Sequence, residues 1–186
     1  MRSASLIVSL TAAAATAVAG PPELVFKLAY GVTRLEHMAG TADGTVVLSR
    51  RDNGNAHGFD VVSFYVDAPS EGDEGARLSI LPIFKDDQEK LELTVGGGAD
   101  CLLHDFRLVR GAEGTYLLVA TREFGDSYVD ARPVTFDRYE LEHNAAGEVG
   151  RPAYYFEWRA ATASKLRYCD VGDAFRHELG LDAYRR

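Results

Sequence analysis

Histidine, cysteine and serine are too few or too scattered in this 186-residue sequence to form the usual catalytic motifs. No two histidines form a His-Glu-x-x-His or His-x-His pair, so no zinc hydrolase site is visible. No serine has a lysine three residues later, and Gly125–Val129 lacks the second glycine of a Gly-x-Ser-x-Gly nucleophile turn. We therefore expect a protein that is not an enzyme and needs no cofactor and no metal ion.

Basic residues are also in short supply. The chain has 20 lysines and arginines against 28 aspartates and glutamates, which gives a formal net charge of −8. Binding to nucleic acid or to anionic lipid depends mainly on positive charge. We therefore expect no nucleic acid as a partner, and the acidic balance favours a soluble protein.

Long apolar runs are missing everywhere except at the start. Residues 1–19 contain Arg2, an apolar run from Leu6 to Ala15 and a small-x-small site at Ala17-Val18-Ala19. This pattern predicts a secretory signal peptide cleaved before Gly20. A transmembrane anchor is the weaker alternative, because a membrane span needs ~20 apolar residues. We expect residues 20–186 to form one domain in the periplasm of a Gram-negative bacterium, with no membrane insertion after cleavage.

The chain has only two cysteines, Cys101 and Cys169. In an oxidising compartment such a pair predicts a disulfide. A metal pair and a reactive thiol are the alternatives, and no histidine spacing supports a zinc site. The bridge would close a loop of 69 residues (169 − 101 + 1) and would contribute about 4 kcal/mol to stability.

What the sequence does contain is a series of short segments rich in β-branched and aromatic residues, separated by turn residues such as Asp43-Gly44. The last stretch, Asp170–Gly180, has an N-cap aspartate, Phe175 and Leu179 on one face and a final glycine, and it predicts a short helix. The predicted class is mostly β, an antiparallel β-sandwich of about ten short strands with a C-terminal α-helix. The predicted strands are 23–30, 32–37, 45–51, 59–66, 77–84 (at an edge or bulge because of Pro82), 91–95, 101–109, 115–122, 133–141 and 153–158.

Two stretches of the sequence, 43–66 and 113–139, follow the same order of features. Each has an acid, Gly-Thr, an apolar segment, arginine and an acid, a polar loop, and then Val-(Ser/Thr)-Phe. A weak internal repeat of this kind predicts one strand–loop–strand unit in each of two sheets, and chance similarity between hairpins is the alternative.

The loops of these two stretches gather charged side chains that could bind a partner. Loops on a rigid sheet are where binding residues concentrate, although an arginine beside an acid at a strand end more often forms a surface ion pair of little energy. The candidate binding residues are Arg51, Asp52, Asn53, His57 and Asp60 in the first loop, and Arg122, Glu123, Asp126, Ser127 and Asp130 in the second.

One histidine, His104, falls inside a predicted strand. Alternation places His104 on the same face as Phe106 and puts Asp105 on the opposite face. A histidine among apolar side chains is more often a hydrogen-bonded core residue than a catalytic base. A small hydrolase with an unrecognised site at His104 or His57 remains a third functional hypothesis.

Four groups of residues occur in an order shared with one known family. They are Asn55–Tyr65, Gly98–Cys101 with Asp105–Leu108, Gly125–Tyr128 with Asp130, and Tyr168–Val171 with Phe175 and Glu178–Leu181. In these segments the chain resembles the CarG-type carbapenem intrinsic-resistance (self-resistance) proteins of Gram-negative bacteria.

The resemblance implies a periplasmic β-sandwich with short terminal helices, similar in fold to bacterial inhibitors of invertebrate-type lysozyme, and a homodimer. It also implies protection against carbapenems without hydrolysis, either by binding the β-lactam or by shielding a protein target. No site residue is carried over from the family. The alternative is a periplasmic inhibitor of a cell-wall hydrolase, or a toxin-immunity protein, that inserts one of the two charged loops into its target.

Overall fold

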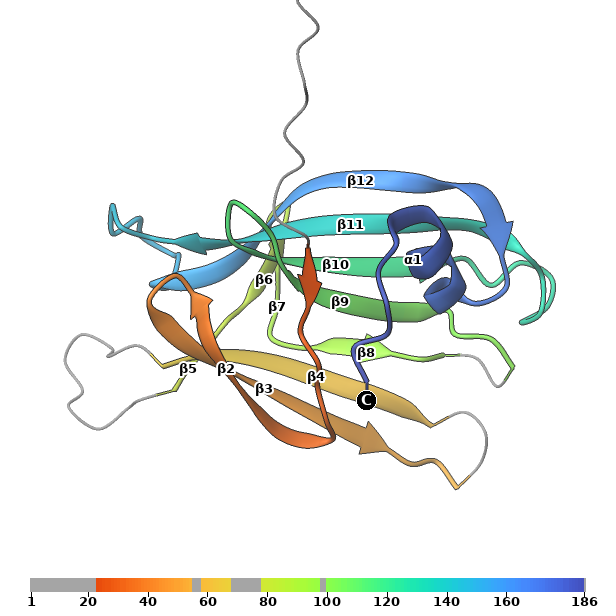
Figure 1. Ribbon diagram of the computed structural model, residues 1–186, viewed down its shortest axis with the longest axis horizontal. Coiled ribbons are helices and arrows are strands. Elements are labelled where there is room, and N and C mark those ends of the chain that lie inside the picture. The colour runs from red at the N-terminus through yellow and green to blue at the C-terminus, as the bar shows by residue number, and fades with distance from the viewer. Residues whose placement is uncertain (1–22, 55–57, 68–77, 98–99, 186) are drawn as a thin grey trace, which may run out of the picture.

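The computed structural model describes residues 23–54, 58–67, 78–97 and 100–185. The predicted signal peptide and the candidate residue His57 lie outside these ranges. Within them, two sheets pack face to face and a single short helix follows the last strand (Figure 1). The predicted β-sandwich with a C-terminal helix is confirmed. None of the described helical segments is long and apolar enough to span a membrane.

The larger sheet has seven strands in the order β1-β9-β10-β11-β12-β6-β7. All neighbours in it are antiparallel except β12 and β6, which run parallel. Its strands are β1 (Leu24–Val25), β6 (Ile83–Lys85), β7 (Gln88–Lys90), β9 (His104–Arg110), β10 (Thr115–Arg122), β11 (Arg132–His143) and β12 (Tyr154–Tyr168).

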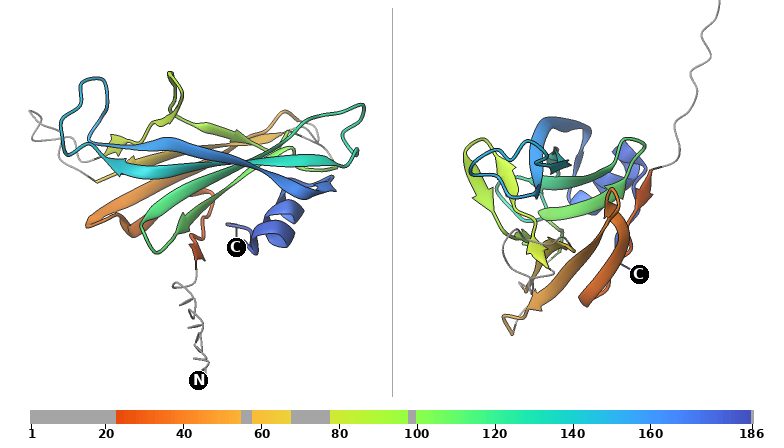
Figure 2. Two further views of the ribbon diagram at one scale, coloured as in Figure 1. Left: turned by 90° about the horizontal axis from the view of Figure 1, so that it is seen from above. Right: turned by 90° about the vertical axis from the view of Figure 1, so that its left-hand side faces the viewer.

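The smaller sheet has five strands in the order β2-β3-β4-β5, and β8 also pairs with β4. Two views at right angles to Figure 1 show the two layers and place α1 (Val171–Leu179) at one end of the larger sheet (Figure 2). The strands are β2 (Gly31–Ala39), β3 (Ala42–Arg51), β4 (Phe59–Val66), β5 (Ser79–Ile80) and β8 (Leu93–Val95).

Two strand and turn predictions were wrong in detail. The predicted strand 77–84 is divided into β5 and β6, which belong to different sheets and are separated by Leu81 and Pro82. The hairpin between β2 and β3 turns at Gly40 and Thr41, while the predicted turn residues Asp43-Gly44 lie inside β3. Gly40 has the positive φ of 65° that a tight turn needs.

Gly44 is needed for close packing and not for a turn. A Cβ built at Gly44 would come within 2.4 Å of the Met38 side chain, which is 1% exposed in the core. Any side chain larger than hydrogen at this position would therefore push Met38 out of place.

The core between the two sheets is centred on aromatic side chains. Phe64 of β4 makes edge-to-face contacts with Phe106 of β9 and Phe156 of β12, with ring centroids 5.8 and 5.5 Å apart. The other face of the larger sheet is covered by α1, whose Val171, Ala174 and Phe175 are buried. Both faces of β9 are therefore covered, which explains why its predicted polar face is buried as well.

The helix α1 begins and ends as the sequence predicts. Asp170 is the N-cap and its carboxylate accepts a hydrogen bond from the Gly172 N–H, while Gly180 takes the left-handed conformation with φ 67°. The predicted apolar pair was half right, because Phe175 is buried but Leu179 is 39% exposed.

The first and last described segments lie side by side along the edge of the larger sheet. The Leu28 N–H donates to the Tyr184 carbonyl at 2.8 Å, and Leu28 also forms a parallel bridge with Arg185. The tilted rings of Tyr184 and Phe106 pack against each other with centroids 4.4 Å apart. The C-terminal tail thus closes the open edge beyond β9.

Candidate functional site

The two predicted binding loops lie at the same end of the sandwich (Figure 1). One connects β3 to β4 and the other connects β10 to β11. The segment between β8 and β9 lies between them, since Gly96 approaches Phe59 on one side and the Arg122 N–H donates to the Leu103 carbonyl on the other. The candidate residues therefore belong to one end face of the molecule, although they come from two sheets.

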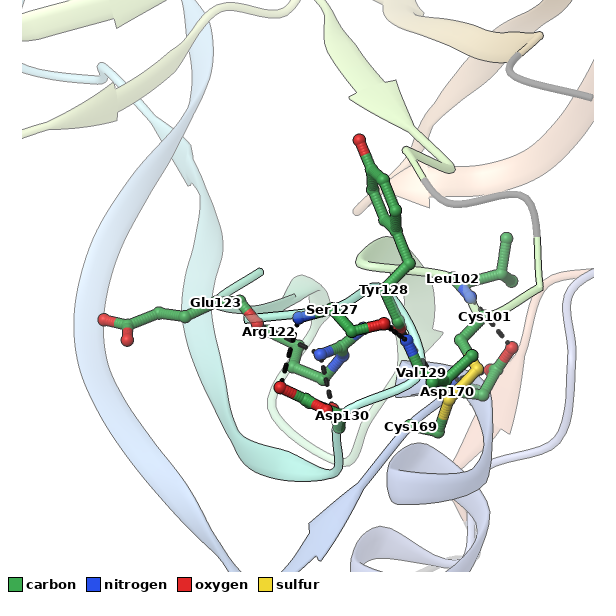
Figure 3. Close-up of a disulfide and its surroundings, with 11 residues drawn as sticks. Cys101, Leu102, Arg122, Glu123, Ser127, Tyr128, Val129, Asp130, Cys169 and Asp170 are labelled. Atoms are coloured by element: carbon green, nitrogen blue, oxygen red, sulfur yellow. Dashed lines mark hydrogen bonds between the residues drawn. A yellow bond between two sulfur atoms is a disulfide. The ribbon is translucent and has the colours of Figure 1, made fainter. Parts of the chain in front are cut away.

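In the second loop, Arg122 holds the backbone in place. Its side chain is 1% exposed and donates to the carbonyls of Glu123, Tyr128 and Asp130 at 3.1, 2.5 and 2.6 Å (Figure 3). Burial lowers the pKa of Arg122, because desolvation disfavours the charged form. Arg122 is therefore a structural residue, and its guanidinium is not presented to a partner.

The acidic side chains Asp126 and Asp130 also form contacts within the loop. The Asp130 carboxylate accepts from the N–H groups of Asp126 and Ser127 at 3.0 and 3.1 Å. Arg132 forms ion pairs with Asp126 at 3.5 Å and with Asp130 at 3.9 Å. The Ser127 hydroxyl accepts from the Val129 N–H at 3.4 Å. Together these contacts fix the path of the loop from 123 to 131.

The exposed surface of this loop contains an apolar group of side chains beside the acids Glu123 and Asp126. Phe124 and Tyr128 form an edge-to-face pair with ring centroids 4.3 Å apart. The exposed fractions are 44% for Phe124, 37% for Tyr128 and 55% for Val129. We call these three residues the loop tip. Sequence reasoning missed them because it followed charge, although exposed aromatic residues on an ordered loop are a common signal of a protein contact.

In the part that the structure describes, the contacts of the first loop are of a different kind. The Asp52 carboxylate accepts from the Gly54 N–H at 2.8 Å. Arg51 is exposed, donates to the Asn53 side chain and lies over the Phe59 ring at 5.3 Å. All of these contacts are local and on the surface.

Asp60 differs from the other candidates, because it lies inside β4 and is 3% exposed. It accepts from the Tyr30 hydroxyl at 3.1 and 3.0 Å, and Arg50 and Arg185 each lie 3.2 Å from it. The buried carboxylate thus ties β4 to the C-terminal tail. Its contacts with both cations compensate the cost of burying the charge.

The predicted disulfide between Cys101 and Cys169 is present, with the two Cα atoms 5.7 Å apart. It joins the segment just before β9 to the residue before the N-cap of α1 (Figure 3). The Asp170 carboxylate supports the same junction by accepting from the Leu102 N–H at 3.1 Å. The disulfide therefore packs against the second loop. The Tyr128 carbonyl oxygen lies 3.9 Å from the Cys169 sulfur.

His104 lies at the start of β9, half-buried, on the same face as Phe106 as alternation predicts. Burial lowers the pKa of His104, and Lys90 contributes in the same direction. The described residues contain no group of histidines, cysteines, aspartates and glutamates that could hold a metal ion. Most of the described candidate residues are thus engaged in local hydrogen bonds and ion pairs, and the loop tip beside them is exposed.

The fold and the sequence both match known proteins. A profile of the family described as "Carbapenem resistance protein CarG-like" matches residues 28–177, which is 150 residues (177 − 28 + 1) of the 186. A crystal structure of CarG has a TM-score of 0.67 and 22% sequence identity, and the match covers 82% of this chain and 94% of that one. A search of curated proteins found no match.

The structural likeness at this identity shows the shared fold, and the profile match, which covers more than half of the chain, shows the family. The predicted resemblance is confirmed. This chain belongs to the CarG-like family of carbapenem resistance proteins.

Proposed function

We propose that this protein is exported to the periplasm and protects the cell from carbapenems by binding or shielding, without hydrolysing the drug. The observation that supports the proposal is that the charged and the apolar side chains of the second loop have different roles. The charged side chains of Arg122 and Asp130 bind the loop's own backbone. Phe124, Tyr128 and Val129 place apolar surface beside the exposed acids Glu123 and Asp126. Such an arrangement is suited to contact with a partner and not to proton transfer.

Export is supported by two features. The disulfide belongs to the class of bonds that persists in oxidising compartments, and the first 19 residues have the composition of a signal peptide. The test is fractionation of cells that express the full chain. The protein is expected in the periplasmic fraction with residue 20 as its N-terminus.

The protection itself is tested by two measurements on the same protein. Expression in a carbapenem-sensitive strain is expected to raise the inhibitory concentration of the drug, while purified protein leaves the absorbance of the carbapenem unchanged over hours. Loss of absorbance at a rate proportional to protein concentration would instead establish a hydrolase.

A second candidate function is inhibition of a cell-wall hydrolase, with the loop tip inserted into the enzyme. The aromatic pair of Phe124 and Tyr128 favours it, since aromatic side chains on a pre-ordered loop lose little conformational entropy on binding. The Phe124→Ala and Tyr128→Ala variants are expected to lose inhibition of an invertebrate-type lysozyme. The Asp126→Ala variant serves as the surface control. Equal inhibition by all the variants would exclude the loop tip as the contact.

We also propose a homodimer joined through β12. The strand pairs with β11 along its length, but β6 contacts it only at Phe156 and Glu157. The N–H groups of Lys165 and Leu166 donate to Glu178 of α1, so residues 159–164 present the sheet edge that pairs with no other described strand. An unpaired edge is a template for a second chain. Light scattering is expected to give twice the chain mass, and Ala161→Lys is expected to give the monomer.

A further inference from the structure

A hollow separate from the loop tip lies between the disulfide, the first turn of α1 and the C-terminal tail. Its volume is about 490 Å³, which is within the usual range for small-molecule sites. We call it the α1 cleft. The residues of its lining that matter here are Leu102, Asp105, Arg107, Gly172, Tyr184 and Arg185. We propose that the α1 cleft binds a small organic carboxylate through Arg107 and Tyr184.

The first argument is a pair of buried donors that have no acceptor. Arg107 is 1% exposed and uses Nη1 for both of its hydrogen bonds, to Asp105 at 2.6 Å and to the Phe106 carbonyl at 2.7 Å. Within the described chain, Arg107 Nε and the hydroxyl of Tyr184 are buried without a hydrogen-bond partner. Buried donors normally have a hydrogen-bond acceptor. These two groups therefore need an acceptor that the described chain does not supply.

The second argument is the shape of the unpaired group. Nε and Nη2 form one edge of the guanidinium, and this is the edge that a carboxylate can grip with two parallel hydrogen bonds. Gly172 leaves room beside it, because a Cβ there would lie 4.0 Å from Nη2. The guanidinium carbon lies over the Phe175 ring, 4.2 Å from its centroid, and Nη1 is held by Asp105, so the orientation of this edge is fixed.

The third argument concerns the charges around the cleft. The Asp170 carboxylate is occupied by the N–H groups of Leu102 and Gly172, and Arg176 pairs with Asp173. Asp100, Asp105 and Arg185 also line the cleft, Asp105 being paired with Arg107, and the first turn of α1 adds partial positive charge. Attraction in the cleft therefore comes from directed donors, even though the chain as a whole is acidic.

The test uses the purified full-length mature protein and succinate as the probe, with sodium chloride of equal ionic strength as the reference. Succinate is expected to shift the amide resonances of Leu102 and Gly172. We expect Tyr184→Phe to weaken binding at least threefold and Arg107→Lys at least tenfold, because each removes a donor. Tyr139→Phe, which alters a buried tyrosine of β11 outside the cleft, is expected to bind as the native protein does.

The Tyr184→Phe variant separates loss of binding from misfolding. It removes a hydroxyl that has no acceptor among the described residues, so it is not expected to lower stability. Two results would overturn the inference. One is the absence of any succinate-specific shift at Leu102 and Gly172, which would leave only internal water at Arg107. The other is equal affinity in all four proteins, which would mean that succinate binds elsewhere as an adventitious ion.

Discussion

The loops β3–β4 and β10–β11 have similar sequences and lie at the same end of the fold, yet they use their arginines in opposite ways. Arg51 is exposed and makes local surface contacts, whereas Arg122 is buried and binds three backbone carbonyls. The difference arises from what lies behind each loop. The disulfide and α1 cover the second loop, so its arginine is desolvated and pre-organised. Similar local sequences therefore place an exposed arginine in one sheet and a buried arginine that binds the loop backbone in the other.

The hairpins that carry these loops also differ in register. In the smaller sheet Val62 pairs with Leu48, while in the larger sheet the corresponding Val134 pairs with Arg122. Each sheet contains one such hairpin, but equivalent residues do not face equivalent partners. Similarity in the order of residues thus does not carry over to similarity in contacts.

The largest expected effect comes from removing the support behind the second loop. Replacing both cysteines, Cys101→Ser with Cys169→Ser, is expected to lower the free energy of unfolding by about 4 kcal/mol, because the 69-residue loop is no longer closed in the unfolded chain. Urea unfolding measures this. Hydrogen exchange should accelerate at Asp126 and Ser127 and stay unchanged at Gly54. Equal acceleration in both loops would show that the disulfide has no local role.

The second prediction compares the two arginines directly. Arg122→Ala is expected to cost about 3 kcal/mol, since it leaves three carbonyls of the loop without their donor. Arg51→Ala is expected to change stability by less than about 0.5 kcal/mol. Urea unfolding at neutral pH measures both values. Similar losses in the free energy of unfolding for the two variants would refute the contrast between a structural arginine and a surface arginine.

The third prediction compares the two loop acids. Asp130→Ala removes an acceptor of two backbone N–H groups and is expected to cost about 1 kcal/mol. Asp52→Ala removes one exposed acceptor and is expected to cost less than half of that. Thermal unfolding of the two variants is a sufficient measurement. A larger loss in Asp52→Ala would mean that the first loop is the more ordered of the two.

The smallest expected effect concerns the junction of β12 and α1, near the second loop. The N–H of Leu166 donates to Glu178, with help from the Tyr168 hydroxyl, and lowers the pKa of Glu178 below its ordinary value of 4.5. A lowered folded-state pKa stabilises the protein above the unfolded-state value and the stabilisation is lost as the pH falls through the folded-state value. The native protein should therefore be more stable than Glu178→Gln at pH 7, and the difference should vanish in acid.

The control for that measurement is Glu89→Gln, a change at an exposed position of β7. Its stability difference from the native protein is expected to be small at every pH. If Glu178→Gln showed the same flat dependence, the Glu178 carboxylate would have no linkage to folding.

The sequence predicted the class, the helix caps and the disulfide, because each depends on local residue types or on a count of two cysteines. The predictions failed where contacts between segments distant in the sequence determine the structure. The second half of β12 has small and polar residues and no apolar alternation, and it is a strand only because β11 pairs with it. The Asp43-Gly44 pair gave a false turn signal, since Gly44 lies inside β3 and leaves room for Met38.

The candidate binding residues in the two loops stay a prediction. The sequence left open whether the two loops form one surface, and the structure brings both loops to one end of the fold. Charge was taken as the signal, but burial by α1 makes Arg122 structural and leaves Phe124 and Tyr128 exposed. Burial of this kind depends on a helix about fifty residues further along the chain, so no local pattern around Arg122 distinguishes it from Arg51.

The pairing of Leu28 with the tail at Tyr184 and Arg185 has a consequence for folding. The edge of the larger sheet stays open beside Phe106 until Tyr184 docks, because Tyr184 is the side chain that covers Phe106 there. Any folding intermediate without this contact therefore exposes apolar surface at that edge.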